Sequence, residues 1–423
     1  MLDTLKNAWK IEDLRKKIIF TMVMLLVYRI GTFIPVPGVD SSYISKLIEG
    51  GGLLGFFDII SGGAFGNFTI FAMSITPYIN SSIIMQLLTV AIPKLEQLAK
   101  EGEEGRKKIA QYTRYFTVVL AFVQAFGITY GLARGSGALK ENNIVTYLVV
   151  SLTLTAGTAF LMWLGEQITD KGIGNGISLI IFTSIVSRAP VAAVSLWNMA
   201  FVAKTMNPLF IPVILAFMVA LVAGVIFVDL GQRRIPVQYS KRMVGRKMYG
   251  GQSTHIPMKV NSSGVLPIIF AVSILAVPQT IAQFTSPTSG FTSWVGRYFT
   301  QEEPLYALLY ALLIIFFTYF YTQITFNPIE IANNLKQYGG FVQGIRPGKP
   351  TSDFLLRISN RLTLVGSLFL AGVAIIPILA SGVTGIPMYF GGTAVLIIVG
   401  VALETSKQLE SQMLMRHYKG FLK

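Results

Sequence analysis

Ten apolar segments, each long enough to cross a lipid bilayer, constrain this chain more than any other feature of its sequence. The hydrocarbon layer of a membrane is ~30 Å thick, and a helix of about 20 residues spans it. Segments of this kind fall at residues 18–35, 69–92, 115–132, 144–164, 174–194, 209–228, 265–281, 305–325, 362–379 and 388–403. Hydrophobic residues make up 52% of the chain and charged residues only 13%, which is more apolar than a soluble core requires. The sequence therefore predicts an all-α membrane protein with ten transmembrane helices.

The lysines and arginines between these segments predict the orientation of the chain. Cytoplasmic loops of membrane proteins carry an excess of Lys and Arg. Here 28 of these residues lie at the two termini and in the loops after segments two, four, six and eight, whereas the alternate loops hold six, matched by six acids. Both termini are therefore predicted to be cytoplasmic, and the net charge of +15 lies on that side of the membrane.

The N-terminal residues 1–17 place Leu5, Trp9 and Leu14 among charged side chains, a pattern typical of an amphipathic helix at the cytoplasmic interface. No small-residue cleavage site follows the first apolar segment, so a cleaved signal peptide is not expected. The chain has no cysteine, which excludes disulfides and thiolate chemistry.

The stretch 55–86 combines a short amphipathic piece, broken at Gly62, Gly63 and Gly66, with an apolar segment rich in hydroxyls and amides. Broken backbone of this kind is tolerated at membrane depth where it is buried in protein or lines a water-filled path. A helix hairpin packed in a bundle, with the polar side chains bonded between helices, explains the same residues equally well.

Residues that would support catalysis or ion coupling are missing from the apolar segments. There is no HExxH, Walker or GxSxG motif, and both histidines, His255 and His417, lie in predicted cytoplasmic segments. Arg29 is the one charge well inside a span, and we expect it to snorkel or to pair locally. We therefore predict no enzyme activity, no catalytic residue, no metal and no cofactor. The interpretation that remains is a conduit through the membrane, in which transport is driven by a partner outside the membrane.

Two long loops on the cytoplasmic side, residues 229–264 and 326–361, are too long to be simple connections. The first has alternating apolar runs on either side of a basic tip and predicts a β-hairpin. The second predicts a short helix after Pro328 and a rigid GIRPGKP turn that fixes Arg346. A positive-inside topology signal would explain the charge of these loops but not their length, which favours a docking surface for an acidic protein or for RNA phosphates.

Several long motifs along the whole chain resemble those of the SecY family of protein-conducting channels. They are RIGTFIPVPG (29–38), SGGA (61–64), EGEEGRKKIAQYTRY (101–115), WLGEQITDKGIGNGIS (163–178), GQRRIPVQY with QSTHIPMKVN, FNPIEIANNLK with GIRPGKPT, and YFGGTAVLI (389–397). One departure is Gln343, where the family usually has a proline, which could alter the stiffness of the turn that follows.

The resemblance implies two pseudo-symmetric halves of five helices, residues 18–194 and 209–406, joined by an external hinge loop at 195–208 and followed by a cytoplasmic tail at 407–423. A ring of aliphatic side chains closes the pore in this family, and by motif it comprises Ile75, Ile79, Ile177, Ile181, Ile269 and Leu396. The plug, a half-helix within about 55–67, comprises Asp58, Ile59, Ile60, Ser61, Gly62, Gly63, Ala64 and Phe65. An apolar constriction resists ions by dewetting and yet does not select among peptide sequences.

The resemblance also implies a lateral gate and a set of partners. The gate lies between spans two and seven and includes Thr76, Asn80, Ser81, Gln86 and Ser273. The motor SecA or the ribosome would dock on Arg242, Arg246, Lys247, Arg346 and Lys349. SecE and SecG would be fellow subunits, signal-sequence-bearing polypeptides the clients, and the bacterial inner (plasma) membrane the location.

Two other functions fit the apolar segments alone. A small-solute secondary transporter is favoured by the number of spans and the broken helix, and disfavoured by the missing intramembrane acids. A structural membrane scaffold is the third possibility, and it predicts that removal of the plug leaves ion leak unchanged.

Overall fold

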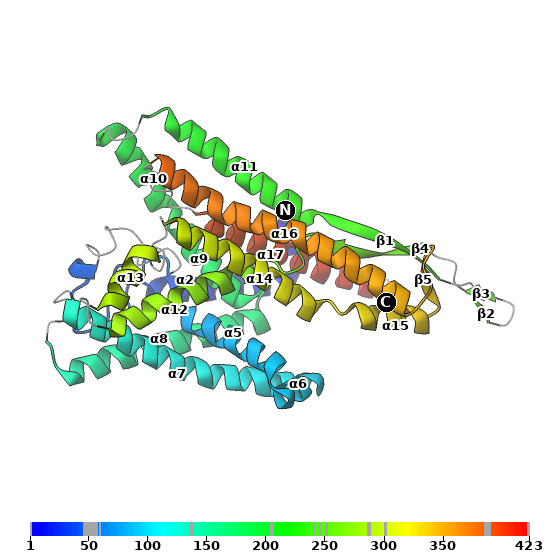
Figure 1. Cartoon of the computed structure of the whole chain (residues 1–423), viewed down its shortest axis with the longest axis horizontal. Coiled ribbons are helices and arrows are strands. Elements are labelled where there is room, and N and C mark those ends of the chain that lie inside the picture. The colour runs from blue at the N-terminus through cyan, green and yellow to red at the C-terminus, as the bar shows by residue number, and fades with distance from the viewer. Residues whose placement is uncertain are drawn as a thin grey trace.

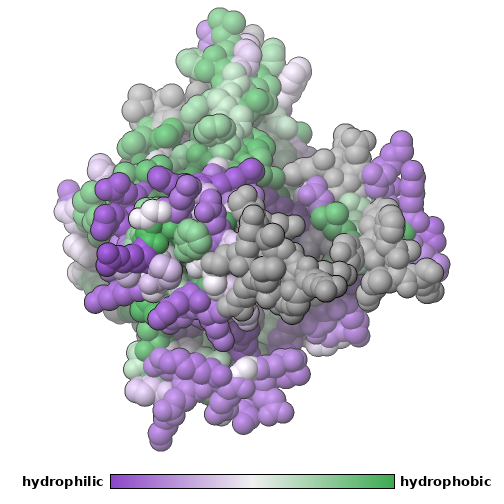
Figure 2. Space-filling model, turned by 90° about the vertical axis from the view of Figure 1, so that its right-hand side faces the viewer, coloured by the Kyte–Doolittle hydropathy of each residue, from purple (hydrophilic) through white to green (hydrophobic). Residues whose placement is uncertain are grey.

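The computed structural model describes residues 2–44, 58, 61–135, 139, 141–203, 207–239, 242–244, 247–249, 253–285, 289–299, 303–384 and 391–420. Long helices run along one axis of the molecule, and strands extend from one end of the bundle (Figure 1). Seen from that end, hydrophilic side chains gather on the left and lower parts of the face, and the upper region, where α11 lies in Figure 1, is largely hydrophobic (Figure 2). The strand-bearing end is therefore the polar end of a membrane-spanning bundle.

The helices before residue 203 pack mainly with one another, through the contacts of α8 with α2, α7 and α9 and of α5 with α7. They are α1 (Leu2–Trp9), α2 (Glu12–Gly31), α5 (Thr76–Ala91), α6 (Pro93–Lys100), α7 (Glu103–Gly135), α8 (Ile144–Lys171), α9 (Gly176–Ser187), α10 (Ala189–Trp197) and the π-helix η1 (Asn198–Val202).

The helices after residue 209 form a second group, in which α14 packs on α12 and α16, and α17 packs on α11 and α16. They are α11 (Phe210–Leu230), α12 (Leu266–Phe284), α13 (Gly290–Tyr298), α14 (Pro304–Thr325), α15 (Pro328–Gln337), α16 (Lys349–Thr384) and α17 (Gly392–Gly420). The two groups meet where α12 contacts α5 and α7 and where α17 contacts α9.

The ten predicted spans correspond to helices of the structure, and the fifth span, 174–194, contains both α9 and α10. Seven stretches in the described part of the chain are long and apolar enough to cross a membrane on their own: Glu103–Ala133, Ile144–Lys171, Gly176–Val202, Phe210–Leu230, Pro304–Gln337, Lys349–Leu379 and Gly392–Met415. The other three are α2, which is charged near its ends, α5, which has 16 residues, and α12, whose apolar part is Leu266–Pro278.

Several helices continue beyond the ends of the predicted apolar spans, into residues that the sequence assigns to loops and tails. The N-terminal helix ends at Trp9, and the first span is one helix from Glu12. In the predicted hinge loop, α10 and η1 continue to Val202, and α17 extends through the predicted tail to Gly420. Lys, Arg, Glu and Gln are good helix formers, so a loss of hydrophobicity does not end a helix.

The plug segment, defined as residues 58–65, is not the predicted half-helix over the residues that the structure describes. Asp58 is helical, but residues 61–75 form consecutive turns before α5 begins at Thr76. Gly62 and Gly63 have φ of 65° and 92°, values that favour glycine and interrupt a right-handed helix. Ile59 and Ile60 lie outside the described residues.

Residues 65–73 are packed in protein, which is how irregular backbone is tolerated at membrane depth. Phe65, Phe68 and Met73 are buried in one cluster with Ala121 of α7 and Leu154 of α8. Pro77, which the sequence places near the middle of a span, lies in the first turn of α5, where its missing N–H has no helical partner to lose.

The predicted β-hairpin of the first long loop is confirmed. Strand β1 (Gln232–Tyr239) pairs antiparallel with β4 (Ser253–Lys259), with Ile235 opposite Ile256, and β2 (Arg242–Val244) pairs with β3 (Lys247–Tyr249) nearer the tip. A third strand, β5 (Gly340–Val342) from the second long loop, pairs with the other edge of β1. The sheet order β4-β1-β5 therefore joins the two loops into one unit.

Candidate functional site

A small cavity lies where α5, α9, α12 and α17 converge, and its walls are mostly aliphatic. Its volume is about 40 Å³, and it is lined by Thr76, Ile79, Ile181, Ile268, Ile269, Val272, Ser273, Ala276, Thr393 and Ile397. None of these side chains is charged. A cavity that could hold little more than one water, with mostly hydrocarbon walls, is an unfavourable place for a hydrated ion.

Three of the six predicted ring residues, Ile79, Ile181 and Ile269, line this cavity together. Ile75 does not line it, although it is 1% exposed and packs in the same cluster as Ile181. The side chain of Ile177 lies against α8, because a Cβ built on Gly165 would be 2.5 Å from its Cδ1 atom.

On α17 the cavity is lined by Ile397 and not by the predicted Leu396. Leu396 is buried in the cluster formed by α12, α14 and α16, whereas Ile397 packs with the helices of the first group. Consecutive helical residues point about 100° apart, so one position separates the two environments. Both residues are aliphatic, and no sequence signal in this stretch distinguishes them.

The predicted lateral gate corresponds to neighbouring helices, since α5 contacts α12. Thr76 of α5 and Ser273 of α12 line the same cavity. Asn80 Oδ1 and Ser81 Oγ, also on α5, are buried and have no hydrogen-bond partner among the residues that the structure describes, and Gln86 is exposed. An unpaired buried polar atom costs about 1–3 kcal/mol, so Asn80 and Ser81 lower the stability of the packing of α5 against its neighbours.

The plug segment is held by an ion pair that sequence reasoning missed. The carboxylate of Asp58 pairs through Oδ2 with the guanidinium of Arg188, the residue between α9 and α10. The other carboxylate oxygen, Oδ1, accepts a hydrogen bond from the backbone N–H of Gly66 at 2.7 Å. The side chain of Asp58 is 8% exposed and that of Arg188 26%, so the pair is largely shielded from solvent.

Two neighbouring residues of α2 bind the same segment. The hydroxyl of Tyr28 donates to Ser61 O at 3.2 Å and shares a 2.5 Å hydrogen bond with Ser184 Oγ of α9. The guanidinium of Arg29 donates to Gly62 O at 2.9 Å and to Ser187 Oγ at 3.3 Å. The prediction that Arg29 pairs locally is confirmed, and its partner is the plug segment.

The two glycines of the plug segment leave no room for side chains. A Cβ at Gly62 would lie 3.0 Å from Ser184 Cα, and a Cβ at Gly63 would lie 3.0 Å from the guanidinium of Arg188. The segment therefore lies tightly against α9. Two features of the sequence could have indicated these contacts with the plug segment. Arg29 is a charge inside a predicted span, and Arg188 is a charge that interrupts one.

The predicted docking residues lie on the joined loops at the polar end. Arg346 and Lys349 are exposed, and the turn between them is fixed by a hydrogen bond from Thr351 Oγ1 to Arg346 O at 2.8 Å. Gly344 and Gly348, with φ of 80° and 99°, bracket this turn. Arg242 and Lys247 belong to β2 and β3, and Arg246 lies outside the described residues.

Within the described part of the chain, no group of three or more His, Cys, Asp or Glu side chains could hold a metal ion. The arrangement offers an apolar constriction, a buried segment beside it and an exposed basic surface at one end.

Comparisons with known proteins point to one family. The family model described as SecY matches residues 69–406. Curated relatives called protein translocase subunit SecY include one from Halalkalibacterium halodurans, 49% identical, and one from Bacillus subtilis, 48% identical, each covering 100% of both chains.

Solved structures show the same fold. One described as a protein-conducting channel has a TM-score of 0.68 at 20% identity and covers 95% of this chain and 93% of its own. Sec61 from a canine ribosome-channel complex has a TM-score of 0.64 at 19% identity, with 95% and 93% coverage.

Proposed function

This chain belongs to the SecY family, and from that membership we propose that it forms the protein-conducting channel of a bacterial Sec translocon. It would pass unfolded secretory polypeptides across the membrane and release signal sequences and transmembrane segments sideways into lipid. The proposal assigns it no catalysis of its own, and the energy for transport would come from a partner.

The observation that carries the proposal is the convergence of aliphatic side chains from both groups of helices on one small cavity. Ile79 and Ile181 come from the first group, and Ile269 and Ile397 from the second. A constriction shared by two groups of helices widens when the groups separate. Its hydrocarbon walls offer no hydrogen-bond pattern that would favour one peptide sequence over another, as a general protein channel requires.

The plug segment supplies the second part of the seal. It is bound to α2 and α9 of the first group through Tyr28, Arg29 and Arg188. Opening the channel would break these contacts, so their combined free energy contributes to the resistance of the resting channel to leak.

A lateral exit between α5 and α12 would account for the polar side chains on α5. A client segment gains a few tenths of a kcal/mol for each Leu, Ile, Phe or Val that moves into lipid, and each central Asp, Lys or Arg costs about 2.5–3.5 kcal/mol. A seam that contains Thr76 and Ser273 and lies near the unpaired Asn80 can open at a lower cost than a purely apolar one.

The joined loops would receive the motor SecA or the ribosome, through Arg346 and Lys349 on the fixed turn and through Arg242, Arg246 and Lys247 of the first loop. SecE and SecG would complete the complex in the bacterial plasma membrane, with both termini of this chain in the cytoplasm. The helical halves would move about the external connection that follows Val202.

Crosslinking to a stalled secretory polypeptide tests the proposal. A photoreactive residue is placed in turn at Ile79, Ile181, Ile269 and Ile397, and the control position is Phe227, which is 80% exposed on the outer side of α11. In vesicles with SecE and SecA, we expect adducts at the four cavity positions and none at the control. Absence of adducts at the cavity, with the polypeptide shown to be engaged, would place the path elsewhere.

A further inference from the structure

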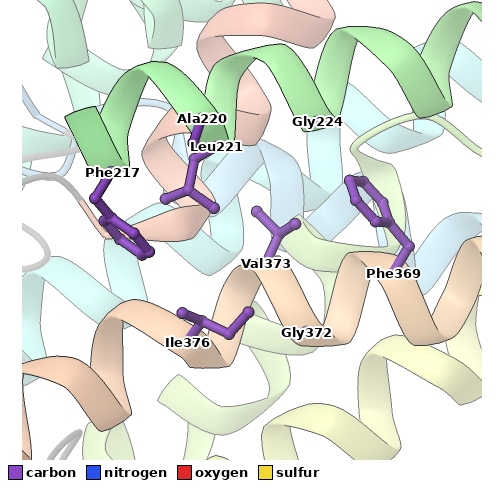
Figure 3. A pocket seen from close by; sticks show the side chains of 8 residues that line it. All are labelled: Phe217, Ala220, Leu221, Gly224, Phe369, Gly372, Val373 and Ile376. Carbon is purple, nitrogen blue, oxygen red and sulfur yellow. The ribbon is translucent and has the colours of Figure 1, made fainter. Parts of the chain in front are cut away.

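An apolar groove lies between α11 and α16, separate from the central cavity (Figure 3). Its volume is about 320 Å³, and all of the residues that line it are apolar. The rings of Phe217 from α11 and Phe369 from α16 lie at its two ends, and Leu221 and Val373 point into it from opposite sides (Figure 3).

The groove contains open space that no side chain of the described residues fills. A Cβ built on Gly224 of α11 or on Gly372 of α16 would meet no atom within 4 Å. Small residues usually allow membrane helices to approach closely, but these two glycines leave a gap. Other parts of the protein also cover little of α11. Only 6% of its apolar stretch is buried inside the protein, compared with 50% of the apolar stretch of α17.

The position and length of the groove favour a hydrocarbon chain as its occupant. All of its residues lie within apolar spans, and its walls offer no polar partner that would hold water. The seven helical steps from Phe217 to Gly224 rise about 10 Å, compared with the ~30 Å length of a transmembrane helix. The space between the two rings is therefore much shorter than a transmembrane helix, and it matches the length of part of an acyl chain.

Two exposed arginines lie where the head group of such a lipid would be. Arg361 precedes Gly372 by eleven residues, or about three helical turns, which places it on nearly the same face of α16 and about 16 Å closer to the cytoplasmic side. Half of the hydrocarbon layer is about 15 Å, so Arg361 reaches the membrane interface when the groove lies near mid-depth.

Arg233 approaches the same level from the end of α11. Gly231 is joined to Val260 by a backbone hydrogen bond of 3.0 Å, and a Cβ built on Gly366 of α16 would lie 2.5 Å from Val260 O. Gly231 and Gly366 therefore lie at one level. Arg233, two residues after Gly231, and Arg361, five residues before Gly366, both lie on the cytoplasmic side of that level.

The acid at the end of α11 does not neutralise these arginines. Asp229 Oδ2 lies 3.5 Å from Lys407 Nζ of α17, so its carboxylate is directed toward that helix. Arg233 and Arg361 are both exposed. Arginine at a membrane interface attracts the phosphates of anionic lipids.

We propose that the groove and the two arginines form one binding site for an anionic phospholipid of the surrounding membrane. One acyl chain occupies the space between Phe217 and Phe369, and the phosphate lies between Arg233 and Arg361. This site is independent of the polypeptide path.

The acyl part is tested with the full chain in vesicles that contain phosphatidylglycerol with a photoactivatable group midway along one acyl chain. Adducts are mapped to peptides by mass spectrometry. We expect them on α11 and α16 around the groove, and we expect Gly372→Leu and Ala220→Leu, which fill it, to remove most of them. The control is Val219→Leu, at a residue 68% exposed on α11, and it should leave them unchanged.

Groove adducts that persist in both filled variants, or that are spread evenly over the exposed face of α11, would overturn the proposal. Their absence from the wild-type protein would also overturn it, and a crosslink from Ala220 to another polypeptide in native membranes would then identify a partner helix as the occupant.

The head-group part is tested by comparing phosphatidylglycerol with phosphatidylcholine that carries the same chains. We expect Arg361→Gln and Arg233→Gln each to lower the preference for phosphatidylglycerol about fivefold, which corresponds to ~1 kcal/mol per arginine at a membrane surface. Arg106→Gln, at an exposed arginine of α7 in the first group of helices, is the matched control. Equal binding of the two lipids by the wild-type protein would overturn the proposal.

Discussion

Neutralising Asp58 should open a leak through the resting channel. In Asp58→Asn the amide oxygen can still accept the hydrogen bond from the Gly66 N–H, so the change removes chiefly the ion pair with Arg188. Loss of one partner from a buried pair costs about 3–5 kcal/mol, because the other charge stays buried without compensation. Arg188 is 26% exposed, so its charge is partly solvated and we take the lower end, about 3 kcal/mol.

That free energy acts on the equilibrium between a seated and a displaced plug segment. When the segment is displaced, Arg188 is freed to water and the penalty disappears, so the mutation destabilises the seated state alone. At about 1.4 kcal/mol for each factor of ten, a loss of ~3 kcal/mol raises the displaced population on the order of a hundredfold. We expect a corresponding rise in ion leak without any client.

Conductance of the purified complex in planar bilayers measures this effect, and a double-mutant cycle separates the ion pair from other causes. Arg188→Gln should leak comparably to Asp58→Asn, and the double variant should leak no more than either single one, because it leaves no buried charge unpaired. Glu141→Gln, which neutralises an exposed acid outside the plug segment, should not leak. Single variants as tight as the wild type, or a double variant whose leak is the product of the two single effects, would refute the reasoning.

Four further predictions concern the seal and the docking surface. Ile397→Ser should raise conductance, because it adds a hydroxyl to the constriction, whereas Leu396→Ser should lower the thermal stability of the protein with little leak; the reverse pattern would restore Leu396 to the ring. Tyr28→Phe should raise leak severalfold, less than Asp58→Asn, since a neutral hydrogen bond contributes about 1 kcal/mol; a leak equal to that of Asp58→Asn would give the hydroxyl a larger role. Gly62→Ala should also leak, because φ of 65° and the approach of Ser184 both oppose a methyl group, and unchanged conductance would argue against tight seating. Arg346→Glu should impair SecA-driven translocation of a secretory protein while insertion of the channel itself stays normal; normal translocation would exclude a docking role for this residue.

The sequence predicted the membrane helices well where hydrophobicity decides the structure. The range 209–228 corresponds to α11, and 305–325 corresponds to α14, because a run of apolar residues in lipid must satisfy its own backbone hydrogen bonds as a helix. It failed at residues 61–75, where a partly apolar run is buried among other helices and its backbone has positive φ at Phe68 and Ser74. Hydrophobicity reports burial at such places and not conformation.

Long-range partners in the site could not be predicted from the sequence. Asp58 and Arg188 are far apart along the chain, and each is an ordinary charge near an external loop until the fold brings the two together. Pairing of β5 with β1 likewise depends on how α14 and α16 place the second loop beside the first. The family resemblance located the constriction within one residue at Ile397, where only the rotation of α17 decides which side chain faces inward.

The shared sheet has a mechanical consequence. Strands β1 and β4 continue directly from α11 and into α12, and β5 lies between α14 and α16, so hydrogen bonds tie the cytoplasmic ends of four helices together. Among the residues that the structure describes, no strand of this sheet comes from the first group of helices. A force applied to the loops would therefore act on these four helices together, and it would reach the first group of helices where α12 contacts α5 and α7.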